Sequence, residues 1–177
     1  HLLVFKRIIN NLLSNFVNMD FLRAVNKIIK LEGGFVDDKD DRGGETKYGI
    51  SKRSFPEYDI PNLTIDTAIE LYREYYWKPS KAERLPEGLV GQYFDMVVNL
   101  GQGNAVKVLQ KAINNSTKNK ITVDGRIGSQ TIKAAEGLGQ KRLCAYRIKY
   151  YADLVSKNPM QEKFYYGWFK RALKWQS

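Results

Sequence analysis

Two carboxylates, Glu32 and Asp41, are the residues of this sequence best suited to chemistry. Glu32 falls four residues after Ile28, on the apolar side of a predicted helix that ends at Gly33 and Gly34. A carboxyl partly removed from water holds its proton more readily, which suits a general acid. The alternative is a glutamate that bends out to solvent, because acids are common at helix ends.

Asp41 lies nine residues after Glu32, within an acidic run with glycines over residues 37–44. Short extended pieces flank this run, at Phe35–Val36 and Thr46–Ile50, and they predict a small hairpin folded over the helix end. Glycoside hydrolysis requires two carboxylates in different environments, one shielded and one solvated. A separation of roughly 6.5–9.5 Å favours inversion at the sugar carbon and about 5 Å favours retention, and the sequence is compatible with both.

The residues around this run do not predict a metal site. An EF-hand register starting at Asp38 puts Arg42 at a ligand position and Gly49 at the closing glutamate position, so the match fails. The only histidine is His1 and the only cysteine is Cys144, which leaves no internal disulfide and no histidine-based nucleophile pair. We expect Cys144 to be buried and unreactive, and we expect neither a metal nor a cofactor.

The charge of the chain predicts a polyanionic partner. Its 177 residues carry a formal net charge of +10, and 43% of them are hydrophobic, enough for one compact domain with at most a modest appendage. Nucleic acid is the general expectation for such a charge, but no nucleic-acid recognition motif accompanies it. The anionic wall of a bacterial cell is an equally good match.

The first 18 residues are too polar and too short to span a bilayer, and no small residues mark a cleavage site. We therefore expect no stable membrane insertion. Met19 directly precedes the predicted helix. Our hypothesis is that the natural chain starts at Met19 and that residues 1–18 are an extension.

Helical periodicity dominates the rest of the chain. The helix before Glu32 has a predicted buried face that consists of Phe21, Ala24, Val25, Ile28 and Ile29. A short helix is predicted over residues 50–55. A longer one, capped by Thr64 and ended by Pro79, has a predicted buried stripe of Ile65, Ala68, Ile69, Tyr72 and Tyr76. Further helices are predicted over residues 89–100, 103–115, 140–156 and 160–174.

The helix over residues 89–100 is apolar except for one narrow polar stripe, formed by Gln92, Asp95 and Asn99. Such a stripe either lines a cleft and contacts substrate or makes buried hydrogen bonds. Trp77, close to the end of the preceding predicted helix, likewise has two interpretations: it is either a platform for sugar rings or a core side chain.

The stretch EGGF, DD, GG, T and YGIS resembles the signature of glycoside hydrolase family 108, the bacterial and phage N-acetylmuramidases also described as secretion activators. The catalytic glutamate of that family matches Glu32. The stretch is also similar to phage-type lysozymes, in which an Asp follows the Glu by nine residues and a Thr comes six later. Asp41 fits, whereas Thr46 arrives one residue early and Lys47 takes its position. Further along, FDMVVNLG and YYGWFKRA resemble segments of the same family, and VDGRIGSQT resembles peptidoglycan-binding modules.

The resemblance implies a mainly α fold, a lysozyme-like helical domain with one small β-hairpin after the catalytic helix. It divides the chain into an N-terminal extension (1–18), a catalytic part (19–102) and a peptidoglycan-binding-like part (103–177) packed against it. The implied activity is an N-acetylmuramidase that cleaves the β-1,4 bond between N-acetylmuramic acid and N-acetylglucosamine. The implied catalytic residues are Glu32, Asp41 and Thr46, and the implied substrate-binding residues are Tyr48, Gln92, Asp95 and Asn99.

The alternative function is a non-catalytic, peptidoglycan-binding accessory of a secretion system. In both cases we expect the partner to be the glycan strands of peptidoglycan rather than nucleic acid, and we expect a monomer. The protein would be made in the cytoplasm and would act in the periplasm or cell wall after passing through a holin or a secretion channel.

Overall fold

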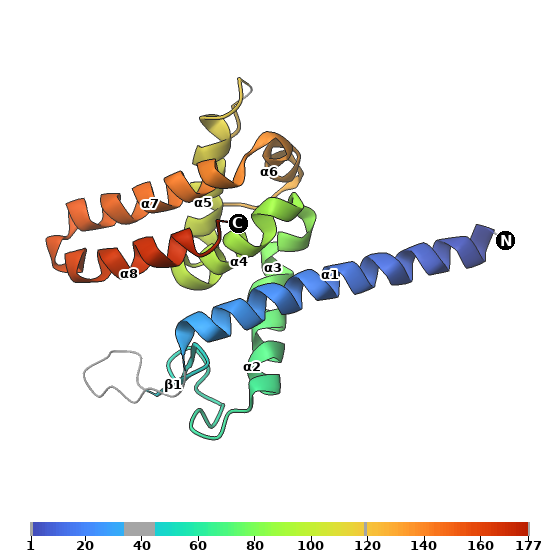
Figure 1. Ribbon diagram of the computed structural model, residues 1–177, viewed down its shortest axis with the longest axis horizontal. Coiled ribbons are helices and arrows are strands. Elements are labelled where there is room, and N and C mark those ends of the chain that lie inside the picture. The colour runs from blue at the N-terminus through green and yellow to red at the C-terminus, as the bar shows by residue number, and fades with distance from the viewer. Residues whose placement is uncertain (1, 34–44, 119, 177) are drawn as a thin grey trace. The chain divides into compact units, whose positions relative to one another are not determined.

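The computed structural model describes residues 2–33, 45–118 and 120–176, with side chains from residue 15 onward. These residues form α-helices and one two-stranded antiparallel sheet, which confirms the predicted mainly α fold (Figure 1). The chain folds as two compact units, His1–Pro79 and Ser80–Ser177. Residue 18 lies inside the first helix and residue 102 begins a later one, and the division predicted from the sequence stays a prediction.

The first unit begins with a long helix, α1 (Leu2–Glu32). Residues 2–32 contain neither glycine nor proline, so the helix continues without a break through Met19, the residue that directly precedes the helix predicted from the sequence. The predicted buried face is confirmed, because none of its five side chains is more than 7% exposed. The helix ends at Gly33, whose φ of +81° suits glycine and whose N–H donates to the Ile29 carbonyl at 3.1 Å.

A small hairpin follows, made of β1 (Thr46–Lys47) and β2 (Ile50–Ser51). Thr46 pairs with Ser51 and Lys47 with Ile50. The helix predicted over residues 50–55 is wrong, because Tyr48 and Gly49 both have positive φ and form the tight turn that returns the chain as a second strand. The predicted strand at Phe35–Val36 and the acidic run over residues 37–44, with Asp41, lie outside the described residues.

The unit closes with α2 (Ile65–Tyr72), the π-helix η1 (Arg73–Trp77) and the short α3 (Lys78–Ser80). The predicted cap is confirmed, since the Thr67 N–H donates to Thr64 Oγ1 at 3.2 Å. Of the predicted stripe, Ala68 and Tyr72 are buried, but Ile65 is 43% exposed in the first turn. Trp77 is buried instead, five residues after Tyr72, because the wide turns of η1 add a residue between inward-facing positions.

The second unit is helical throughout its described part. Its elements in order are η2 (Ala82–Arg84), α4 (Glu87–Leu100), α5 (Gln102–Asn114), α6 (Ser129–Ala134), η3 (Ala135–Gly137), α7 (Gln140–Lys157), η4 (Pro159–Gln161) and α8 (Glu162–Leu173). The four helices predicted here are confirmed to within two residues at each end. Helix α4 packs against α5 and α7, and α7 and α8 form a helical hairpin (Figure 1).

Cys144 belongs to the core of this hairpin, as predicted. The side chain is 4% exposed and packs in one cluster with Tyr151 and Ala172. Burial raises the pKa of the Cys144 thiol, while the positive charge of Arg147 opposes this. A thiol held protonated in this way is a poor nucleophile.

The DGRIG segment (residues 124–128) forms a turn, and Gln110 of α5 holds this turn in place by hydrogen bonds. The Gln110 amide donates to Asp124 Oδ1 at 2.8 Å and to Thr131 Oγ1 at 3.2 Å, and its oxygen accepts from the Gly125 N–H at 3.0 Å. This segment therefore joins α5 to α6 through a buried amide. Among the described helices, none is long and apolar enough to cross a bilayer.

Candidate active site

Glu32 is the last residue of α1, and its side chain is half-buried. The hairpin turn lies directly against it. A Cβ atom added to Gly49 would come within 2.7 Å of Glu32 Cγ and 3.2 Å of Glu32 Cβ. The hairpin therefore covers the aliphatic part of this side chain, and only a residue without a Cβ fits at the point of contact.

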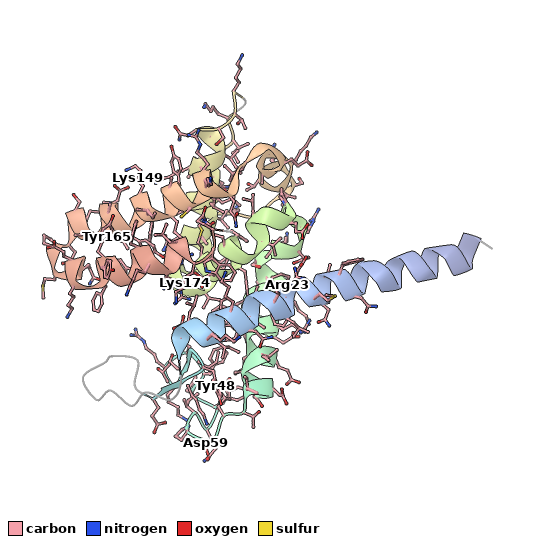
Figure 2. The ribbon with its side chains drawn as sticks, viewed as in Figure 1. Arg23, Tyr48, Asp59, Lys149, Tyr165 and Lys174 are labelled. Atoms are coloured by element: carbon pink, nitrogen blue, oxygen red, sulfur yellow. The ribbon has the colours of Figure 1, made fainter. Side chains whose placement is uncertain are left out.

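The turn that covers Glu32 is held in place by α2. Tyr48 has a φ of 54°, which is unusual for a non-glycine residue, and Gly49 has a φ of 80°. The Tyr72 hydroxyl donates a hydrogen bond to the Tyr48 carbonyl at 3.0 Å. Figure 2 shows Tyr48 in the hairpin below the end of α1. The end of α1, the hairpin turn and α2 therefore meet at Glu32.

Tyr76 adds a phenol near the carboxyl group. Burial raises the pKa of Tyr76, and the negative charge of Glu32 raises it further. The rings of Tyr72 and Tyr76 lie 5.5 Å apart. By contrast, Trp77 is 3% exposed and packs edge-to-face on Phe21 at 5.3 Å, which supports the interpretation as a core residue. The phenol of Tyr76 stays protonated at neutral pH and so can donate a hydrogen bond to a carboxylate.

The sequence analysis did not assign Gly49, Tyr72 or Tyr76 to the site. Both tyrosines fit the buried stripe of a helix, and this pattern does not indicate that their hydroxyl groups lie near Glu32. The available signal was the pair Tyr48–Gly49 between two short extended pieces, since glycine in a two-residue hairpin turn indicates positive φ.

The hairpin also carries Thr46 and Lys47. Thr46 is half-buried in β1. The ammonium group of Lys47 donates to the Pro61 carbonyl at 2.7 Å, and successive strand residues face opposite sides, so the two side chains diverge. Asp41 lies outside the described residues. The catalytic roles of Thr46 and Asp41 and the substrate contact of Tyr48 stay predictions.

Asp95 belongs to the second unit, where it is fully buried between two arginines. Its Oδ2 accepts from Arg147 Nη2 at 2.5 Å, and its Oδ1 accepts from Arg171 Nη2 at 2.7 Å. Arg147 is itself fully buried, and among the described residues its Nη1 has no hydrogen-bond partner. One buried carboxylate thus ties α4 to both α7 and α8.

Asn99 and Gln92 also make internal hydrogen bonds. The Tyr151 hydroxyl donates to Asn99 Oδ1 at 2.7 Å and accepts from Arg147 Nε at 2.9 Å. Gln92 is 1% exposed and accepts from the Gln176 amide at 2.9 Å. The polar stripe of α4 therefore makes buried hydrogen bonds, the second of its two interpretations, and its contact with substrate stays a prediction.

Metal-ligating side chains do not gather in the described part of the chain. Over residues 2–33, 45–118 and 120–176, no group of three or more His, Cys, Asp or Glu residues is arranged to hold a metal ion. The described residues around Glu32 provide a carboxyl group, a phenol and the main chain of a tight turn. Such a set can move a proton and hold a sugar by hydrogen bonds.

Comparison with known proteins agrees with this arrangement. Residues 25–101 match the family model described as glycosyl hydrolase 108, and residues 104–173 match a model described as a predicted peptidoglycan domain. The chain is similar to the solved structure of SagA from Brucella abortus, with 27% identity, a TM-score of 0.73, and 88% of this chain and 90% of that one covered. No curated protein matches at a significant level.

These matches confirm the resemblance found in the sequence. The glycosyl hydrolase region contains Glu32, the hairpin and α2, and it ends one residue after α4. The peptidoglycan region starts within α5 and ends with α8. Residues 25–101 of this chain are therefore similar to the glycosyl hydrolase 108 family, and residues 104–173, which follow them in the sequence, are similar to a predicted peptidoglycan domain.

Proposed function

We propose that this protein is an N-acetylmuramidase that hydrolyses the β-1,4 bond between N-acetylmuramic acid and N-acetylglucosamine in peptidoglycan. The observation that carries the proposal is the position of Glu32, half-buried at the end of α1 inside the glycosyl hydrolase region. Its stem is covered by Gly49, and its charge acts on the phenol of Tyr76. A carboxyl group that is partly shielded from water is suited to donating a proton.

In this mechanism Glu32 protonates the glycosidic oxygen as the bond to the muramic acid C1 breaks. Positive charge develops on the sugar ring, and water then adds to C1 and gives its proton to a carboxylate of the site, either Asp41 or the ionised Glu32. The products are a reducing N-acetylmuramic acid end and a free hydroxyl on N-acetylglucosamine. We assign Asp41 to position the water or to stabilise the charged ring. The Tyr76 phenol is positioned to stabilise the Glu32 carboxylate once its proton has left.

The test compares the wild type with Glu32→Gln on purified cell-wall suspensions. We expect the amide to slow the loss of turbidity by about 10²–10⁴-fold, because it cannot donate the proton. Glu70→Gln is the matched control, since Glu70 is an exposed carboxylate on α2 in the same unit. Mass spectrometry of the products should find reducing muramic acid ends.

Two results would overturn the proposal. Equal rates for the wild type and Glu32→Gln would remove Glu32 from the chemistry. Wall binding without hydrolysis in either protein would favour the alternative, a non-catalytic accessory of a secretion system. The second function keeps the same ligand but assigns no proton transfer to Glu32.

The remaining expectations follow from the same ligand. A net charge of +10 suits the anionic cell wall, and we propose that the protein acts there or in the periplasm as a monomer, after passing through a holin or a secretion channel. Sedimentation at several concentrations tests the monomer. Tight, salt-sensitive binding to duplex DNA without affinity for the wall would contradict this choice of partner.

A further inference from the structure

A cavity of about 670 Å³ opens in the second unit where the end of α5 meets η3 and the beginning of α7. Its polar side chains are those of Asn115, Ser116, Lys141, Arg142 and Tyr146. All of them fall inside the residues that match the peptidoglycan domain. The cavity shares no residue with the Glu32 site, so its chemistry is a separate question.

The charged side chains that line the cavity are all positive, which suits a negatively charged ligand. Lys141 and Arg142 are both exposed, and none of the described residues that line it is acidic. The 18-residue helix α7 begins at the same place, after Gly139, with no side-chain cap and no acidic residue in its first turn. The positive end of the helix adds to the two cationic side chains.

A second cavity, of about 580 Å³, adjoins the first at Gly137. Its lining is more mixed, with the hydroxyl groups of Thr117 and Thr122, the amide of Gln130, and three charged side chains, Lys120, Lys133 and Glu136. The pair therefore combines one cavity whose charged side chains are all cationic with one of mixed charge that also offers uncharged hydrogen-bonding groups. A ligand with an anionic part joined to an uncharged polar part matches both.

Peptidoglycan has this composition. Its sugars carry hydroxyl and acetamide groups without charge, and its peptide stems carry carboxylates. We propose that the cavity between α5, η3 and α7 binds the carboxylates of the peptide stems of peptidoglycan, through Lys141, Arg142 and the first turn of α7. The proposal rests on peptidoglycan being the ligand, as proposed above, but not on hydrolysis.

The test measures how the full chain binds sacculi. Glu32→Gln serves as the background, so that the wall stays intact during the measurement. Two ligands are compared, intact sacculi with their stems and the soluble glycan strands that remain after an amidase has removed the stems. We expect binding to stem-bearing sacculi to weaken by about tenfold or more in Lys141→Glu/Arg142→Glu, since two charge-assisted hydrogen bonds are lost.

The matched control is Lys157→Glu/Lys163→Glu, which changes the net charge equally. Both lysines are exposed, at the end of α7 and the beginning of α8, and neither lines the cavity. The expected result is near-normal binding by this control. Circular dichroism verifies that both double variants are folded.

Three outcomes would overturn the proposal. Equally weakened binding of the two double variants to stem-bearing sacculi would mean that general charge attraction, and not the cavity, causes the binding. Equal binding to intact sacculi and to stem-free glycan strands would exclude the stems as the ligand, yet hydrolysis by the wild type would then still support the muramidase. Loss of all sacculus binding in the Glu32→Gln background would contradict the stem site, and wild-type product analysis would decide the muramidase separately.

Discussion

Gly49→Ala is the substitution that tests the structure around Glu32 most directly. The added Cβ would come within 2.2 Å of the Tyr72 hydroxyl oxygen and 2.7 Å of Glu32 Cγ. Both distances are far below van der Waals contact, so the turn, Tyr72 or Glu32 must move. Because Tyr72 holds the turn through the Tyr48 carbonyl, a shift of the turn also weakens that hydrogen bond.

The expected loss of stability in Gly49→Ala has two parts. Alanine at a φ of 80° costs about 1–2 kcal/mol in backbone strain. Overpacking against Tyr72 and Glu32 adds about 1–3 kcal/mol. We therefore expect Gly49→Ala to lower the free energy of unfolding by about 2–5 kcal/mol. A displacement of Glu32 by about 1 Å should also slow hydrolysis about 10²-fold.

Gly101→Ala is the matched control for backbone strain. Gly101 has nearly the same φ, 79°, but no described atom lies within 4 Å of its Cβ position. Gly101→Ala should therefore lower the free energy of unfolding by only about 1–2 kcal/mol. Denaturant unfolding measures both variants, and turbidity loss at a temperature where both are folded measures activity.

A double variant separates the two clashes at Gly49. Tyr72→Phe removes the hydroxyl oxygen but leaves Glu32 in place, so it should restore part of the stability of Gly49→Ala and little of its activity. Equal destabilisation in Gly49→Ala and Gly101→Ala, with full activity in both, would refute the contact between the hairpin turn and Glu32.

Three further predictions concern stability. Asp95→Ala should cost about 3–5 kcal/mol in denaturant unfolding, because it leaves the buried Arg147 without its counter-charge; a cost below about 1 kcal/mol would argue against the buried ion pair. Thr64→Ala should cost about 1 kcal/mol through loss of the α2 cap, and an unchanged midpoint would contradict it. The Gln110 amide lowers the pKa of Asp124 from its ordinary value of 3.8, so the stability from this group is full above that value and is lost as the pH falls through the lower folded-state pKa. The difference in unfolding free energy between the wild type and Asp124→Ala should therefore be constant at neutral pH and shrink as the pH falls below about 4, and a difference that stays constant there would exclude this linkage.

Local patterns in the sequence determined the parts of the protein that depend on near neighbours. The spacing of apolar residues gave the buried face of α1 and placed Glu32 at its last turn, where Gly33 ends the helix. Thr64 also predicted the start of α2, because the side chain of a helix cap accepts a hydrogen bond from the main chain only three residues ahead. The family motifs around Glu32 were also readable without coordinates.

Only the tertiary structure decided which distant groups meet. The period of α4 put Asp95 on a polar stripe, but its partners Arg147 and Arg171 lie 52 and 76 residues further along the chain. The contact of Gly49 with Glu32 and the hydrogen bond from Tyr72 to Tyr48 depend on how a hairpin and two helices pack. Periodicity shows that a helix face is buried, but not what lies against it, because many partners satisfy the same apolar stripe. The π-turns of η1 likewise bring Trp77 into the core, which decides between the two interpretations that the sequence left open for this residue.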